Sequence, residues 1–278
     1  PADNLGQERA GGIPGGDQGG NLPPRTVVSD VVHSLVSEAP AATGTDLVLT
    51  PADDIGHDAG PVARFDANLA AIRLVKQLEA EHRLATPAEQ MVLARFSGWG
   101  DSAFNPAFPL KGYNAPPTTD EGKNLVTRGD ELRRLLSKEE YQAIEQSRLN
   151  AFLTPPAMIR AMWDAVARLG LGRLAHPRVL ETSAGSGRFL ALQPKELAAK
   201  SERHAVEKDL LTGAMLKQMF PNVDVYVMGF EEAPIGNDSV DLAISNVPFG
   251  DIPIFDPSYI GPKKMFLNQI HNYFFAKG

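Results

Sequence analysis

Apolar positions recur along the chain with two different periods. In residues 61–149 they follow the three- and four-residue spacing of amphipathic helices, as Phe65, Leu69 and Ile72 do. In residues 150–278, short runs rich in β-branched residues alternate with helical patterns. The first part is therefore expected to be a mostly helical segment, and the second an α/β region with a parallel, doubly wound sheet.

The helical part contains clear start and stop signals. Thr86-Pro87 predicts a helix start with threonine as the N-cap, and Ser97-Gly-Trp-Gly100 predicts its stop. A loop rich in Pro, Gly and Asn is expected to run to about Thr127. Two short helices are then predicted at Gly129–Leu136 and Lys138–Arg148. We interpret residues 61–149 as a packing platform.

The second part predicts four strands and the helices between them. The strands are expected at Arg178–Glu181, His204–Glu207, Val223–Met228 and Asp241–Ser245. The helices are expected at Met158–Leu169, from Arg188 to about Ala199, at Leu210–Phe220, and from about Lys263 to the C-terminus.

Residues 1–60 differ from the rest in composition. They are rich in Gly and Pro, with a weak helical pattern only at Val27–Val36, and bury too little apolar surface to offset the entropy of ordering. We expect a flexible acidic linker. The chain begins at Pro1 without a methionine, so we expect a piece of something longer.

Charge and composition narrow the possible functions only slightly. The net charge is −7, and residues 1–60 account for it with nine acidic and two basic residues, which leaves 25 of each sign in the rest. Composition thus neither supports nor excludes nucleic acid. The absence of cysteine excludes disulfides and thiolate metal sites. No signal peptide or membrane-spanning apolar run is evident, so a cytoplasmic location without a membrane partner is the default expectation.

A glycine loop follows the first predicted strand, in the run Glu181-Thr-Ser-Ala-Gly185-Ser-Gly187. An acidic residue ends the strand, and two glycines let a ligand approach the backbone where a Cβ would block it. The free amides of the following helix start add donors. A dinucleotide site would require a third glycine where Leu190 stands, which argues against NAD.

Two more acidic positions follow predicted strands. Glu207 ends the second strand, some twenty residues after the glycine loop, where a carboxylate can accept both ribose hydroxyl protons. Phe230 and Glu231 follow the third strand and could flank and hydrogen-bond an adenine ring. A surface glutamate and a solvated turn are the plainer interpretations.

The segment Asn246-Val247-Pro248-Phe249 follows the fourth predicted strand. An asparagine oxygen and a backbone carbonyl can accept both protons of an exocyclic amine and direct its lone pair at a methyl donor. Proline keeps this turn rigid without adding an amide donor, and an aromatic ring can stack on a flipped base.

Together these motifs resemble the N6-adenine DNA methyltransferases, which use S-adenosylmethionine (SAM). The catalytic (N/D)-P-P-(Y/F/W) motif of that family corresponds to Asn246–Phe249, with valine at the second position. The resemblance implies a Rossmann-like parallel sheet, a flipped adenine in double-stranded DNA as substrate, and no metal. It also implies a cofactor site made of Phe152, Thr154, Pro155, Glu181, Ser183, Ala184, Gly185, Gly187, Glu207, Phe230 and Glu231.

A closer resemblance extends from about Arg64 to the end. Arg64-Phe-Asp-Ala-Asn68, Ser97-Gly-Trp-Gly100 and Asn246-Val-Pro-Phe-Gly250 resemble large methyltransferase–helicase fusion proteins of phages, plasmids and defence islands, including antirestriction and DISARM-type proteins. This implies that residues 150–278 are a C-terminally incomplete catalytic region with a truncated sheet. A helicase or other defence-system subunits are the implied partners.

The sequence thus predicts methyl transfer from SAM to N6 of adenine, within a restriction-modification, antirestriction or phage-defence system. An N-methyltransferase acting on RNA or protein glutamine is one alternative. A non-catalytic SAM-binding or SAM-free interaction module of a larger complex is the other.

Overall fold

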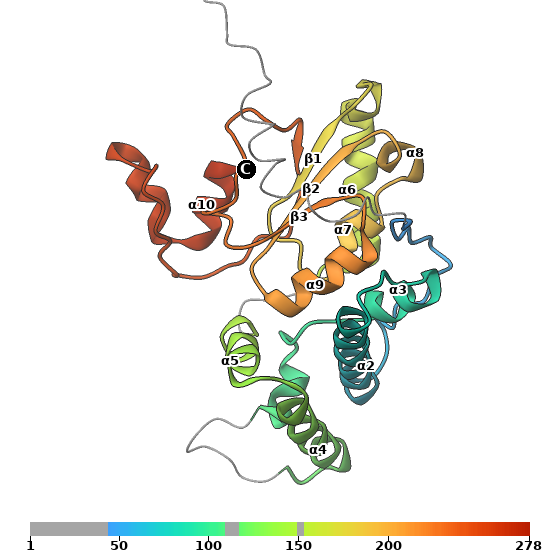
Figure 1. Ribbon diagram of the computed structural model, residues 1–278. Helices are drawn as coiled ribbons and strands as arrows, with labels where there is room; N and C mark the ends of the chain where they lie inside the picture. The colour runs from blue at the N-terminus through green and yellow to red at the C-terminus, as the bar shows by residue number, and fades with distance from the viewer. Residues whose placement is uncertain (1–43, 109–116, 149–152) are drawn as a thin grey trace, which may run out of the picture. The chain divides into compact units, whose positions relative to one another are not determined.

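The computed structural model describes residues 44–108, 117–148 and 153–278. The strands of the described residues form a four-stranded parallel sheet in the order β3-β2-β1-β4 (Figure 1). The strands are β1 (Arg178–Glu181), β2 (Glu202–Glu207), β3 (Asp224–Val227) and β4 (Leu242–Ala243). The predicted α/β class with a Rossmann-like parallel sheet is therefore confirmed.

The strand order reverses next to β1. The chain runs outward from β1 through β2 to β3, and then returns to place β4 on the other side of β1. Val179 of β1 lies opposite both Arg203 of β2 and Leu242 of β4. In open α/β sheets, the carboxyl ends of strands at such a reversal border a crevice that accepts ligands. The loops after β1 and β4 meet there.

Helices precede β1, connect β1 to β2 and connect β2 to β3, and one predicted helix is divided in two. The elements are α6 (Pro156–Leu169), α7 (Arg188–Ala191), α8 (Lys195–Ala198) and α9 (Leu210–Met219). The single helix predicted from Arg188 to Ala199 was wrong, because Pro194 lacks an amide hydrogen and divides it into two single turns. Gly213 lets α9 lie directly on β3, since a Cβ there would lie 2.6 Å from Val227 Cγ1.

The helical part was predicted well except at one boundary. Its elements are α2 (Pro61–Ala80), α3 (Pro87–Ala94), the 3-10 helix η1 (Ser102–Ala107), α4 (Asp120–Leu135) and α5 (Lys138–Ser147). The apolar stripe of α2 is buried and Thr86 caps α3, both as expected, and Glu89 completes the cap by accepting from the Thr86 amide. The loop expected up to Thr127 was wrong at its end, because Thr119 caps a helix that already begins at Asp120.

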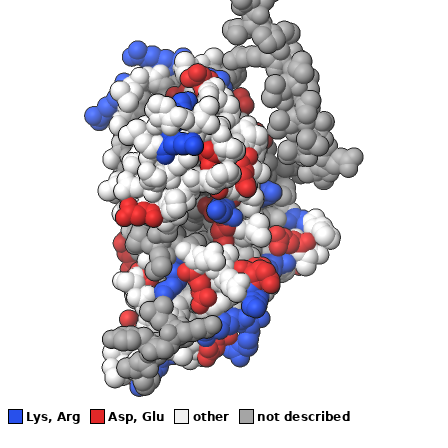
Figure 2. All heavy atoms as spheres, turned by 90° about the vertical axis from the view of Figure 1, so that its left-hand side faces the viewer, with Lys and Arg blue, Asp and Glu red and all other residues white. Residues whose placement is uncertain are grey.

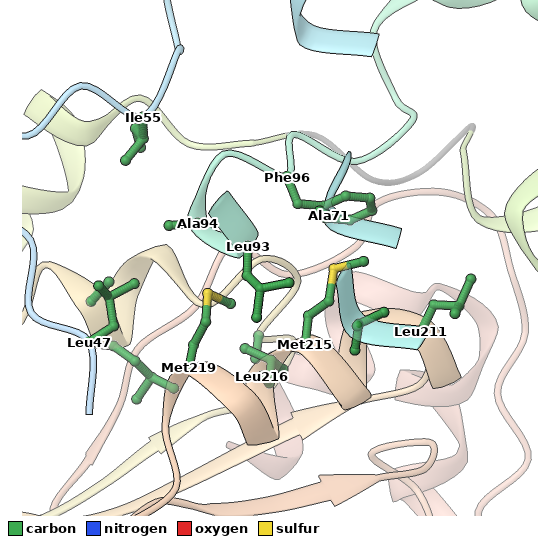
Figure 3. Packing of buried hydrophobic residues seen from close by; sticks show 14 of the residues in the cluster. Leu47, Ile55, Ala71, Leu93, Ala94, Phe96, Leu211, Met215, Leu216 and Met219 are labelled. Atoms are coloured by element: carbon green, nitrogen blue, oxygen red, sulfur yellow. The ribbon is translucent and has the colours of Figure 1, made fainter. Parts of the chain in front are cut away.

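Part of the predicted linker is packed. Residues 1–43, including the pattern at Val27–Val36, lie outside the described residues. Leu47, Leu49 and Ile55 are buried, and the Leu47 amide donates to the Met219 carbonyl oxygen at 2.8 Å. Figure 3 shows Leu47 beside the α9 side chains that also meet Leu93. The linker expectation was therefore wrong for residues 44–60, because Leu47, Leu49 and Ile55 are buried in the main hydrophobic cluster.

One hydrophobic cluster joins the helical part to the sheet. Helices α2 and α3 both pack against α9, and the cluster runs from Phe65 through Leu93 to Leu216. A second cluster joins the sheet to the C-terminal helix α10 (Ile270–Lys277). The boundary proposed between residues 149 and 150 stays a prediction.

The last predicted helix is two elements, η3 (Gly261–Asn268) followed by α10. Tyr273 and Phe274 of α10 are buried, and the Tyr273 hydroxyl donates to Asp256 Oδ2 at 2.6 Å. Met265 and Phe266 of η3 remain exposed. The apolar side chains of the final segment are thus partly covered by residues of the same chain.

Candidate functional site

A cavity of about 970 Å³ lies at the carboxyl ends of the strands. The loops after all four strands contribute to its wall, as expected where the strand order reverses. The structure brings most of the candidate residues together there: Thr154, Glu181, Ser183, Ala184, Gly185, Glu207, Phe230, Glu231, Asn246 and Pro248.

The two glycines of the loop after β1 have different roles. Gly185 has φ of +53°, and a Cβ there would meet no atom within 4 Å, so its backbone is open toward the cavity. Gly187 has φ of +71°, but a Cβ there would lie 2.5 Å from Phe220 Cε2 and 2.6 Å from Leu216 Cδ2. Gly187 thus makes room for α9 and does not line the cavity, and its expected place in the cofactor site stays a prediction.

Glu181 is a buried carboxyl at the end of β1, only 1% exposed. Burial raises its pKa well above the usual value, and the negative charge of Glu207 raises it further, against a smaller effect of the Leu190 amide. Its Oε2 atom has no hydrogen-bond partner among the described residues. A buried polar atom without a partner is costly, so this cavity wall suits a ligand that donates a hydrogen bond or carries positive charge.

Glu207 ends β2 and holds the glycine loop. Its Oε2 accepts from the Gly185 amide at 2.7 Å, and its Oε1 accepts from the Asp209 amide at 2.8 Å. Burial raises its pKa to about 7, although these amides favour the ionised form. The side chain remains partly exposed at the cavity, and a carboxylate has lone pairs left for ligand hydroxyls.

The segment after β3 places an aromatic residue and an acid on the cavity. Phe230 is 2% exposed, and its ring centroid lies 5.1 Å from that of Phe274 in α10. The ring is thus held mainly by protein, with only a small surface left for a ligand. Glu231 lies 3.7 Å from Lys208 Nζ, so its charge is partly compensated.

The segment after β4 divides between the cavity and its surroundings. Asn246 and Pro248 line the cavity, and Ser245 Oγ donates to the Ser183 carbonyl oxygen at 3.3 Å, which joins this segment to the glycine loop. Val247 is buried in the second hydrophobic cluster. Phe249 is 52% exposed and does not line the cavity. The side chain of Val247 is thus packed inside the protein, and that of Phe249 lies outside the cavity.

The segment before α6 is placed less completely. Thr154 and Leu153 line the cavity, whereas Pro155 is the N-cap of α6 and does not. Phe152 lies outside the described residues. Thr154 is therefore the candidate from this segment with cavity contact.

Sequence reasoning missed the contribution of the helical part. Ser97, Gly98 and Trp99 line the cavity, and Asn68 fixes them: its Nδ2 donates to the Gly98 carbonyl oxygen at 2.7 Å, and its Oδ1 accepts from the Ser97 amide at 2.7 Å. The available signal was a polar residue three positions after Phe65, on the apolar stripe of α2. Two of the segments that carry the resemblance, Arg64–Asn68 and Ser97–Gly100, are thus in direct contact.

Three further observations concern metals, membranes and charge. No group of acidic and histidine side chains suited to a metal ion occurs within residues 44–108, 117–148 and 153–278. None of the helices in these ranges is long and apolar enough to span a bilayer. On the face drawn in Figure 2, acidic and basic side chains are interspersed without a broad area of either sign.

No family model and no curated protein matches the chain. Among solved structures, one from Listeria monocytogenes, assigned as a class I SAM-dependent methyltransferase, has 16% identity and a TM-score of 0.39, covering 77% of this chain and 69% of that one. The type I restriction-modification methyltransferase subunit of Streptococcus thermophilus has 11% identity and a TM-score of 0.33, covering 73% and 62%. The type IIG restriction endonuclease BpuSI has 17% identity and a TM-score of 0.29, covering 79% and 28%. At these values the likenesses assign no chemistry to the site.

Proposed function

We propose that this chain is the SAM-binding and catalytic part of a methyltransferase that modifies N6 of adenine in DNA. The observation that carries the proposal is that Asn246 and Pro248 line the same cavity as Glu181, Gly185 and Glu207. A segment suited to hold an exocyclic amine and a loop suited to hold a nucleoside thus share one space.

The cavity residues suit SAM as the cofactor. Glu207 would accept hydrogen bonds from the ribose hydroxyls, and the open backbone at Gly185 would allow close approach. The unpartnered Oε2 of Glu181 would form a hydrogen bond with the bound cofactor, and Thr154 would donate one to the carboxylate of SAM. When bound, SAM supplies a methyl group on a positively charged sulfur. No metal is required for this transfer.

The proposed target is the amino group of an adenine that has left the base stack. The Asn246 side-chain oxygen and the Val247 carbonyl oxygen would accept its two protons, and Pro248 would keep this turn rigid. Phe249 is half-exposed and retains ring surface on which a base can stack. Catalysis would then consist mainly of positioning and of hydrogen bonds to the amine.

Asn246→Ala tests the amine-binding role. We expect a loss of methyl-transfer rate on the order of a hundredfold or more, with SAM affinity almost unchanged, because the side chain acts on the target amine. Asn237→Ala is a matched control, since Asn237 is exposed and does not line the cavity. Calorimetry with SAM and transfer of a labelled methyl group measure the two properties separately. Full activity of Asn246→Ala would refute the role.

The nature of the substrate is tested by offering labelled SAM with DNA, RNA and protein in parallel. We expect the label on adenine in DNA, as for an enzyme of a cytoplasmic restriction-modification, antirestriction or phage-defence system. A helicase is the proposed partner. If the label appeared on RNA or on protein glutamine instead, that molecule would be the substrate and the DNA assignment would be wrong. SAM binding without methyl transfer to any substrate would identify a non-catalytic module.

A further inference from the structure

A second cavity of about 340 Å³ adjoins the first, and it is rich in positive charge. Its wall contains His57, Arg64, Ser102 and Arg188, and it shares Ser97, Leu153 and Arg188 with the larger cavity. We infer that His57, Arg64 and Arg188 form a phosphate-binding site. This inference goes beyond the proposed function and does not rest on it.

Arg188 supplies the strongest observation. It is 4% exposed, and none of the carboxylates in the described part of the chain forms an ion pair with it. Its Nε has no hydrogen-bond partner among those residues, and its Nη1 lies 3.3 Å from His57 Nδ1. Burial lowers its pKa to about 10, with a further contribution from the charge of Arg64, so the guanidinium still carries its charge at neutral pH.

Another buried arginine shows how this protein otherwise compensates such a charge. Arg203 is 8% exposed and forms an ion pair with Asp46. A buried charge is costly unless it is paired, and Arg188 lacks such a carboxylate. An anion in the adjoining cavity would take that place.

The acidic residue of the cavity does not compensate Arg188. Asp101 Oδ2 pairs with Arg64 Nη2 at 2.5 Å, and its Oδ1 accepts from the Ala103 amide at 2.8 Å. Arg64 Nε donates to the Ala59 carbonyl oxygen at 2.9 Å. Two guanidinium groups therefore face one carboxylate, and the cavity keeps one net positive charge.

The geometry of the donors favours phosphate. His57 before α2, Arg64 in the first turns of α2 and Arg188 in α7 meet at the cavity, which Ser102 also lines. A tetrahedral oxyanion can accept hydrogen bonds from several directions at once, and guanidinium forks match phosphate oxygens well. The source is either a phosphodiester of a nucleic acid that enters the larger cavity or free inorganic phosphate.

Thermal unfolding in sodium phosphate, compared with sodium chloride at equal ionic strength and pH 7, tests the site without SAM. At ten times the dissociation constant, phosphate should raise the Tm of the wild-type chain by roughly 3–5 °C. Arg188→Met keeps an apolar side chain and removes the charge, so it should abolish this rise. Arg168→Met removes an equal charge from an exposed position on α6 and should retain it.

Ser102→Asp is a second variant in case Arg188→Met does not fold. Ser102 is exposed at the start of η1, where an acidic residue is tolerated, and the new carboxylate would repel phosphate. This variant should also lose the rise in Tm. A rise of equal size in either variant, or no rise in the wild-type chain, overturns the inference.

Calorimetry identifies the source of the phosphate. A short single-stranded oligodeoxynucleotide and inorganic phosphate are titrated separately into the wild-type chain and Arg188→Met, in the absence of SAM. Affinity for at least one probe should fall at least tenfold in the variant, and the tighter probe identifies the source. Unchanged affinity of the variant for both probes overturns the inference. Because no methyl transfer is measured, this result is independent of the proposed enzymatic activity.

Discussion

The helical part and the sheet part treat their buried polar groups differently. In the helical part, Asn68 is completely buried but satisfies Ser97 and Gly98 with both ends of its amide. Gln90 is 4% exposed and donates to the carbonyl oxygens of Thr45 and Gln218. Through these hydrogen bonds, each side-chain amide fixes the backbone of a loop or helix end to the helix that carries it.

In the sheet part, several buried polar atoms lack partners. Every buried side-chain atom without a hydrogen bond in the described residues belongs to the sequence after position 180. Glu181, Ser186 and Arg188 are among them, and all three line the larger cavity. Unpaired polar groups that gather on a cavity wall suit a ligand, whereas paired ones stabilise the fold. The difference supports the proposal that the loop after β1 contacts a ligand.

The glycine loop allows the strongest test of this contrast, because it contains both kinds of position. Gly187→Val would push a β-branched side chain into Phe220 and Leu216 at positive φ, so we expect a loss of roughly 3–5 kcal/mol in the free energy of unfolding. At Gly185 an added Cβ would meet no atom within 4 Å, so Gly185→Val should cost only roughly 1–2 kcal/mol, which comes from the positive φ of the backbone.

Urea denaturation measures both glycine variants, and calorimetry with SAM follows for those that fold. Gly185→Val should lose most of its SAM affinity, because the new side chain occupies the open space of the cavity. Equal stability losses at the two positions would show that packing does not distinguish them. If Gly187→Val folded stably but could not bind SAM, Gly187 would belong to the ligand site.

Substitution of Asn68, in the helical part, should cause the next largest loss of stability. Asn68→Ala leaves the Ser97 amide and the Gly98 carbonyl oxygen without partners and creates a small void, which should cost roughly 2–4 kcal/mol. Asn124→Ala is the control, since that residue is exposed on α4 and should change stability by less than about 0.5 kcal/mol. A small effect at Asn68, measured by urea denaturation, would contradict its role in fixing the loop backbone.

The fold could be predicted from the sequence wherever a local signal governs the structure. The strand Arg178–Glu181 was placed correctly, and the cap at Thr86 was recognised, because a short-range pattern specifies each of them. The break at Pro194 was overlooked although proline carries a clear signal. The burial of Leu47 required a partner distant in the sequence, Met219, which no local pattern reveals.

The candidate site was predictable in its strand-end residues and not in its surroundings. Glu181, Gly185 and Glu207 could be expected at one edge because parallel strands end together. The packing role of Gly187 could not be predicted, because a glycine required for packing and one required for a ligand appear identical in a sequence. Arg188 and His57 meet across 131 positions, and only the folded chain brings them together.

Of the substitutions proposed here, Glu181→Gln is expected to change stability least. Its effect should also depend on pH in a way that the effect of Asn68→Ala does not. Its raised pKa means that the folded state holds a proton more tightly than the unfolded state. The stabilisation from this group is complete below the usual pKa of a carboxyl and is lost as pH rises through the raised value. Glutamine has nearly the shape of a neutral carboxyl group but never ionises.

Glu181→Gln should therefore differ from the wild-type chain by less than about 1 kcal/mol at pH 5, because the raised pKa favours the neutral carboxyl there. At pH 8 the variant should be the more stable of the two, because it avoids a buried charge next to Glu207. Urea denaturation at both pH values measures the difference, with Asn68→Ala as the comparison, since that variant should be destabilised at both. If Glu181→Gln lost as much stability as Asn68→Ala at pH 8, the unpaired carboxyl would be a structural group, and the contrast between the two parts would fail.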